Sequence, residues 1–162
     1  MTTTDPSTTG APVFRSRGPR FNHVAMSVPA DLLDAEHRAL LGDFYRTVFG
    51  WEELPTMTED RHRLVFSCYA VEQFVFLIAD DPPMTCPRLD HFGFSVGAEA
   101  ELDDILDRAR AYQERDPRVD IIDKAVDDHG MLAITSIYVR YLLPMMVEIQ
   151  WWDFKDGGRA GA

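Results

Sequence analysis

The amino-acid sequence predicts an α+β fold made of two similar βαβββ modules. Residues 19–28 (PRFNHVAMSV) and residues 87–96 (PRLDHFGFSV) are near-copies that agree at five of ten positions. Each copy is followed by one helical pattern and then by three extended segments. An internal repeat sets the architecture before any local feature does. We therefore predict two equivalent halves in which one helix packs on a sheet.

The domain organisation follows from the length of these halves. A unit of about 65 residues is marginal for independent stability. We therefore expect one domain over residues 18–155, with modules at about 19–81 and 87–154. Residues 1–17 and 156–162 are rich in polar and small residues, and we expect disordered tails there.

The first half begins with an alternating strand at residues 23–28, which Pro29 stops. A helix capped by Asp31 then runs to Phe49, with apolar positions at spacings of three and four. Gly50 ends the helix. Three extended segments complete the half, at 51–54, 63–69 and 73–79. The last two should form a hairpin because the connection between them is short.

The second half repeats this order. A strand at 89–96 precedes a helix at 99–115, which Asp116-Pro117 breaks. Three further strands are predicted at 119–126, 131–141 and 145–152.

Composition excludes several functions. The net charge of −11 argues against nucleic acid and against an anionic membrane surface, since both need clustered Lys and Arg. No apolar run approaches the ~20 residues that span a bilayer. The N-terminus lacks the pattern of a secretory signal, and two cysteines are too few for a disulfide framework. We expect a cytoplasmic protein with a small-molecule substrate.

Three side chains suggest a metal site. His23 and His91 occupy the same position of the repeat, and Glu148 lies in the apolar closing strand of the second half. A carboxylate in such a strand is costly unless it is paired or binds a metal, the other reading being an edge-strand side chain in water. Two imidazoles and one carboxylate leave coordination positions open, which suits Fe(II), Mn(II), Zn(II) or Ni(II).

The chain resembles the vicinal oxygen chelate superfamily, which includes glyoxalase I, extradiol dioxygenases, and fosfomycin- and bleomycin-resistance proteins. The resemblance covers roughly residues 20–153. It rests on the repeated [ND]-H-x-[AG]-[MF]-S-V strand, on FYRTVFGWEE at 44–53, on the doubled βαβββ order and on the closing V-E-I strand. It implies a cupped mixed sheet around one metal, Fe(II) or Mn(II) being favoured, with His23, His91 and Glu148 as ligands. It also implies a homodimer.

The resemblance bears on the reaction as well. Aligning the ends of the closing strands places Leu77 opposite Glu148, so the first half offers no fourth ligand of the glyoxalase type. Residues 129–148 partly match the extradiol dioxygenase signature, which implies catalytic roles for Tyr138 and His129. We expect an extradiol-dioxygenase-like metalloenzyme. The alternatives are an epimerase, lyase or glyoxalase-type isomerase, and a metal-free drug-binding protein.

Overall fold

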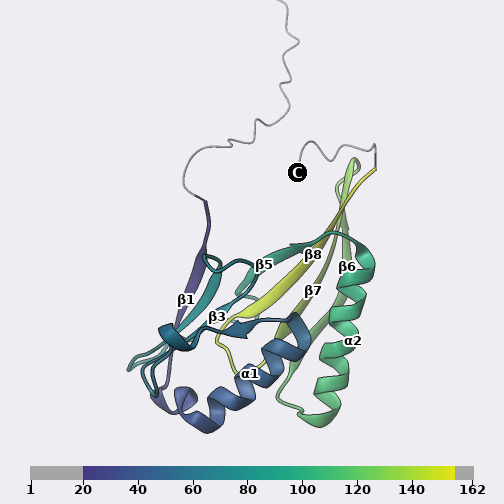
Figure 1. Cartoon of the computed structure of the whole chain (residues 1–162). Coiled ribbons are helices and arrows are strands. Elements are labelled where there is room, and N and C mark those ends of the chain that lie inside the picture. The colour runs from purple at the N-terminus through teal and green to yellow at the C-terminus, as the bar shows by residue number, and fades with distance from the viewer. Residues whose placement is uncertain (1–19, 156–162) are drawn as a thin grey trace, which may run out of the picture.

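The computed structural model describes residues 20–155, and the predicted tails at 1–17 and 156–162 lie outside them. The chain forms two four-stranded sheets, each accompanied by one long helix (Figure 1). The first module contains β1 (His23–Val28), η1 (Ala30–Leu33), α1 (Ala35–Phe49), β2 (Glu52–Glu53), η2 (Pro55–Met57), β3 (Arg63–Ser67) and β4 (Phe74–Ala79). The second contains β5 (His91–Val96), α2 (Glu99–Arg115), β6 (Asp120–Asp128), β7 (Leu132–Arg140) and β8 (Met146–Phe154).

The two sheets have equivalent topology. Their strand orders are β1-β4-β3-β2 and β5-β8-β7-β6. In each sheet the first strand pairs in parallel with the last, and the other neighbours are antiparallel. This confirms the two βαβββ modules predicted from the repeat. The repeated strands, β1 and β5, both lie at a sheet edge.

The first helix begins later than predicted. Asp31, the predicted cap, lies inside the short 3₁₀ turn η1, and Asp34 caps α1 by accepting a hydrogen bond of 3.0 Å from the backbone N–H of His37. Gly50 follows α1 with a φ of 74°, the left-handed conformation that glycine adopts at little cost. The second helix has the predicted bounds, Glu99–Arg115, and Asp116 is its C-cap.

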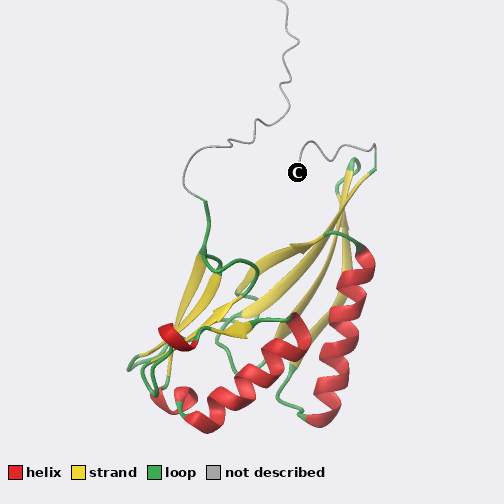
Figure 2. Cartoon of the chain, viewed as in Figure 1, coloured by secondary structure: helices red, strands yellow, loops and turns green. Residues whose placement is uncertain are grey.

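The core lies between the helices and one face of each sheet. Figure 2 shows the two helices beside the sheets. Alternate residues of the strands point to this face, and the buried residues of α1 and α2 cover it. The fully buried members with the largest side chains are Tyr45, Tyr141, Phe44, Phe66, Met26, Leu33, Leu41, Leu64, Leu77, Leu102 and Ile137. The opposite face of each sheet is free of the helices.

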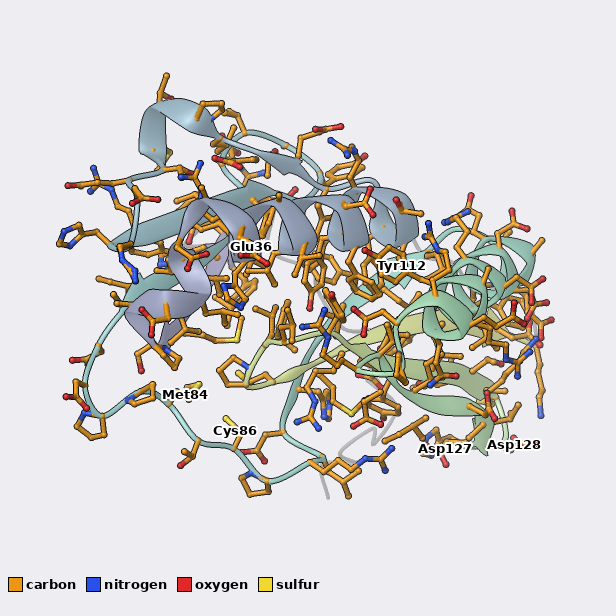
Figure 3. The ribbon with its side chains drawn as sticks, turned by 90° about the horizontal axis from the view of Figure 1, so that it is seen from below. Glu36, Met84, Cys86, Tyr112, Asp127 and Asp128 are labelled. Carbon is orange, nitrogen blue, oxygen red and sulfur yellow. The ribbon has the colours of Figure 1, made fainter. Side chains whose placement is uncertain are left out.

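The modules are joined through their helices. The hydroxyl of Tyr45 in α1 donates a hydrogen bond of 3.0 Å to the backbone oxygen of Tyr141, which follows β7. Tyr112 lies between α1 and α2, and its hydroxyl donates to Asp43 at 2.9 Å (Figure 3). The first contact is buried and the second is partly buried, and together they join α1 to α2 and to the segment that follows β7.

Two further features concern the surface. β2 is shorter than predicted because Pro55 begins the turn η2 directly after Leu54. The linker between the modules carries Met84 and Cys86 and runs apart from both helices (Figure 3). Among residues 20–155, no helix is both long and apolar enough to cross a bilayer.

Candidate functional site

The helix-free face of the second sheet carries the candidate site. Gly93 of β5 lies opposite Glu148 of β8, which in turn lies opposite Tyr138 of β7. His91 is two residues from Gly93 and therefore points to the same face. Three of the predicted residues, His91, Tyr138 and Glu148, thus come together on neighbouring strands.

His91 presents one ring nitrogen to Glu148. Its Nε2 lies 3.4 Å from the carboxylate Oε2 of Glu148. Its Nδ1 lies 2.7 Å from the backbone oxygen of Leu89, which can only accept, so Nδ1 carries the hydrogen. In the neutral ring the lone pair is therefore on Nε2. A metal-binding histidine is commonly oriented in this way, with its other nitrogen donating to a backbone carbonyl.

Glu148 is the buried member of this group. Its side chain is 7% exposed, whereas that of His91 is 39% exposed. A buried carboxylate is costly unless hydrogen bonds or a cation compensate it. The phenol of Tyr138 lies beside the carboxylate, and the ring of Tyr138 meets that of His91 edge-on at 5.1 Å. Burial, followed by the hydrogen bond to Glu148, raises the pKa of the Tyr138 phenol to about 12.

Sequence reasoning missed Gly93. A Cβ atom at this position would lie 3.2 Å from Oε2 of Glu148, closer than ordinary contact. The absence of a side chain therefore leaves room for the buried carboxylate. A comparison of the two repeats could have indicated this position, because the residue equivalent to Gly93 in the first half is Ala25.

The first module positions His23 by similar means. Its Nδ1 lies 2.8 Å from the side-chain oxygen of Asn22, an acceptor, so Nε2 is again the free nitrogen. The ring stacks on Phe74 at 4.7 Å. His23 pairs with Phe74 and Ala25 with Phe76, just as His91 pairs with Met146 and Gly93 with Glu148.

The first-module counterpart of Glu148 is therefore Phe76 and not Leu77. The sequence alignment was wrong by one residue, which in a strand exchanges the two faces. Leu77 is fully buried on the helix side. The inference drawn from the alignment is unchanged, because neither residue can bind a metal.

His129 lies apart from the other predicted residues. It occupies the β6–β7 turn, where its N–H donates to the backbone oxygen of Leu132 at 2.8 Å. Leu132 and Tyr138 are six positions apart on β7, which corresponds to about 20 Å of strand. The chain therefore does not bring the imidazole of His129 to Glu148, and its expected role beside Tyr138 needs correction.

The three predicted ligands do not form a cluster within one chain. Among residues 20–155 there is no group of three or more His, Cys, Asp or Glu side chains that could hold a metal. His23 instead lines a cleft of about 700 Å³ between the modules, which Trp51, Phe92 and Phe94 also line. The predicted ligands thus lie in two separate places, with His23 in one and with His91 and Glu148 in the other.

The fold is the one that the resemblance to the vicinal oxygen chelate superfamily predicted, two βαβββ modules. Solved structures with this fold include a lactoylglutathione lyase from Agrobacterium tumefaciens, with 21% identity, a TM-score of 0.58 and coverage of 83% of this chain and 94% of that one. A glyoxalase/bleomycin resistance protein/dioxygenase from Nocardioides has 17% identity, a TM-score of 0.57 and coverage of 93% and 92%.

A third similar structure is a fosfomycin resistance protein from Listeria monocytogenes in complex with Mn(II) and sulfate. It has 15% identity, a TM-score of 0.57 and coverage of 83% of this chain and 91% of that one. No protein-family model and no curated protein matches the sequence. At these identities the comparisons establish the fold.

Proposed function

We propose that the protein is a metal-dependent enzyme acting on a small oxygen-bearing substrate, and that two copies of the chain complete each metal site. In this proposal His23 of one copy joins His91 and Glu148 of a second copy. The observation that carries the proposal is the matched orientation of the two imidazoles. Each is held through Nδ1 and offers Nε2, and one of them faces a buried carboxylate.

Features of the sheet edges support association with a second copy of the chain. β1 and β5, which carry the two histidines, both lie at the edge of a sheet. Unpaired edge strands are natural places for another chain to dock. Phe21 and Leu89, each two residues before a histidine, are 78% and 67% exposed. Exposed apolar side chains at equivalent positions of the repeat suit an interface that is symmetric between copies.

The donor set fits a divalent metal. Two imidazole nitrogens and one carboxylate suit Fe(II) or Mn(II), and also Zn(II) or Ni(II). The Listeria fosfomycin resistance protein was solved as a complex with Mn(II), which is consistent with a metal of this class. A bound metal would supply Lewis acidity toward two neighbouring oxygens of a substrate.

Tyr138 is the residue that we assign to the substrate. A phenol is protonated at neutral pH and can donate a hydrogen bond. The phenol lies beside both His91 and Glu148, and if Glu148 binds a metal, the O–H of Tyr138 becomes available to a substrate oxygen. A donor fixed in this way stabilises negative charge that develops on a substrate oxygen.

Two reaction types remain to be separated. Ring-cleaving dioxygenase chemistry agrees with the three-donor set and with Tyr138. Isomerase, epimerase or lyase chemistry is the alternative, because the dioxygenase signature implies an imidazole beside Tyr138 and His129 lies apart from it. A metal-free binding protein would not explain why both histidines are held through Nδ1 and offer Nε2.

Metal analysis tests the proposal. Purified protein should bind Fe(II), Mn(II), Zn(II) or Ni(II), and the variants His23→Ala, His91→Ala and Glu148→Ala should each bind more weakly. Asp104→Ala, which removes an exposed carboxylate of α2, serves as the control. Equal metal binding by the wild type and the triple variant would contradict the proposal.

Oxygen uptake separates the reaction types. Protein loaded with Fe(II) without oxygen is mixed with a panel of catechols, and oxygen is then admitted. Uptake that is lost in Tyr138→Phe would support ring cleavage with Tyr138 as the substrate donor. No uptake with any catechol would direct the search to isomerase, epimerase and lyase substrates.

A further inference from the structure

A cluster of two arginines and one aspartate lies at one end of the same sheet face. Arg88 binds both carboxylate oxygens of Asp120, through Nη2 at 2.6 Å and Nε at 3.1 Å. Arg140 binds one of these oxygens through Nη2 at 2.8 Å. The hydrogen bond from Arg88 is the main reason that the pKa of Asp120 lies below its ordinary value. The carboxylate is therefore ionised at neutral pH.

The cluster keeps a positive charge that no carboxylate compensates. Within residues 20–155, Asp120 is the one acidic partner of either guanidinium. Lys124 shows the opposite balance of charge, because this single cation lies between two carboxylates, those of Glu99 and Asp103. An excess cation is unexpected in a chain whose net charge is −11. Arg140 also keeps donors available, because a guanidinium has five N–H groups and, in the part of the chain that the structure describes, Arg140 donates only to Asp120 and to the backbone oxygen of Pro144.

The position of Arg140 relates the cluster to the candidate site. Arg140 is two residues from Tyr138 on β7, so both side chains point to the helix-free face. The separation of their Cα atoms is about 7 Å, and two strand spacings put His91 about 10 Å from Arg140. A substrate of a few bonds can therefore reach from His91 to the guanidinium.

The first module lacks this cluster and provides an internal comparison. Arg20 is the repeat counterpart of Arg88 and pairs with the single carboxylate of Glu72 at 3.4 Å. The residue equivalent to Arg140 in the first module is Ser67. Ser67 comes directly after the Phe66–Val75 pair, and Arg140 comes directly after the Val139–Val147 pair. The repeat therefore keeps one arginine in both halves, but the second guanidinium occurs in the second half alone.

We propose that Arg140 and Arg88 form a subsite for an oxyanion of the substrate, a carboxylate or a phosphoryl group. Its role as a substrate subsite rests on the proposed function, since the oxyanion would hold one end of the molecule whose other end lies at His91 and Glu148. A planar guanidinium matches both kinds of anion through paired hydrogen bonds. Asp120 orients the two arginines and competes with the ligand for them.

NMR titration of the arginine Nε–Hε signals tests the subsite directly. Inorganic phosphate and acetate are the probes, added separately to metal-free protein and to protein loaded with diamagnetic Zn(II). We expect saturable shifts of the Arg140 and Arg88 signals. The probe that binds more tightly, phosphate or acetate, indicates which kind of oxyanion the subsite prefers. Binding should weaken about tenfold or more in Arg140→Gln and in Arg88→Gln, whose side chain is largely exposed, because each loses charge-assisted hydrogen bonds. Arg20→Gln is the matched control and should change nothing.

Asp120→Asn distinguishes a binding site from a structural ion pair. Removal of the competing carboxylate should tighten phosphate or acetate binding by about threefold or more, because the uncompensated charge doubles. Absence of saturable binding by the wild type, or equal affinities in wild type and Arg140→Gln, would overturn the subsite. If the protein binds the anions but binds no metal, the proposed function is overturned and the two arginines form an anion site without a metal. Metal binding without anion binding would overturn the subsite alone.

Discussion

Replacement of Gly93 by alanine should weaken metal binding more than it weakens the fold. The new Cβ would lie 3.2 Å from Oε2 and 3.8 Å from Cβ of Glu148. The carboxylate must then retreat by a few tenths of an ångström. Crowding of this kind costs about 1–3 kcal/mol at most, and the loss of glycine's freedom in the unfolded chain returns about 0.4–1 kcal/mol. We expect a net loss of about 1 kcal/mol in the free energy of unfolding.

The effect on the metal should be larger because the displaced atom is a proposed ligand. Changes next to metal ligands typically lower affinity by about 10–100-fold, and we expect a loss in that range for Gly93→Ala. Urea denaturation measures the stability, and competition with a chelator measures the Zn(II) affinity. Ala25→Gly, at the equivalent position of the first module, should leave the affinity unchanged. Wild-type metal affinity in Gly93→Ala would refute the assignment of Glu148 as a ligand.

Three further predictions concern residues outside the site. Tyr45→Phe removes the buried hydrogen bond to Tyr141 and should lower the free energy of unfolding by about 1–3 kcal/mol in urea denaturation. Hydrogen bonds from Arg118 and then from Tyr141 lower the pKa of Asp116 below its ordinary value of 3.8. The ionised carboxylate therefore stabilises the folded protein fully above pH 3.8, and this stabilisation is lost as the pH falls through the lower pKa of the folded state. The stability difference between wild type and Asp116→Asn should therefore shrink at acid pH, and a constant difference would contradict this. Burial raises the pKa of Cys68 to about 12, so iodoacetamide should modify this thiol slowly in the native protein and rapidly in urea.

Much of the fold could be predicted because the repeat and the local patterns agree. The two PRxxHxxxSV segments predicted equivalent strands, and β1 and β5 occupy equivalent edges. The bounds of α2 were predicted correctly because its apolar spacing is regular and Pro117 follows it. The start of α1 was not, since Asp31 and Asp34 are both suitable caps and only packing of the intervening turn decides between them.

The site was less predictable because it depends on pairing between distant strands. The mistaken alignment of Leu77 with Glu148 arose from counting along single strands, whereas the register with β1 identifies Phe76. The contact between Gly93 and Glu148 likewise exists only once β5 lies beside β8. The Arg88–Asp120 pair joins residues that are 32 positions apart and carry no shared motif.

Subunit mixing tests the central claim most directly, that each metal site combines His23 of one copy with His91 and Glu148 of another. One variant carries His23→Ala, the other carries His91→Ala and Glu148→Ala, and each alone should bind the metal weakly. When they are unfolded together and refolded, half of the dimers are mixed, and each mixed dimer holds one complete site. We predict recovery of about a quarter of the wild-type metal sites in a two-fold dimer. No recovery after mixing, with dimers present by light scattering, would contradict the claim.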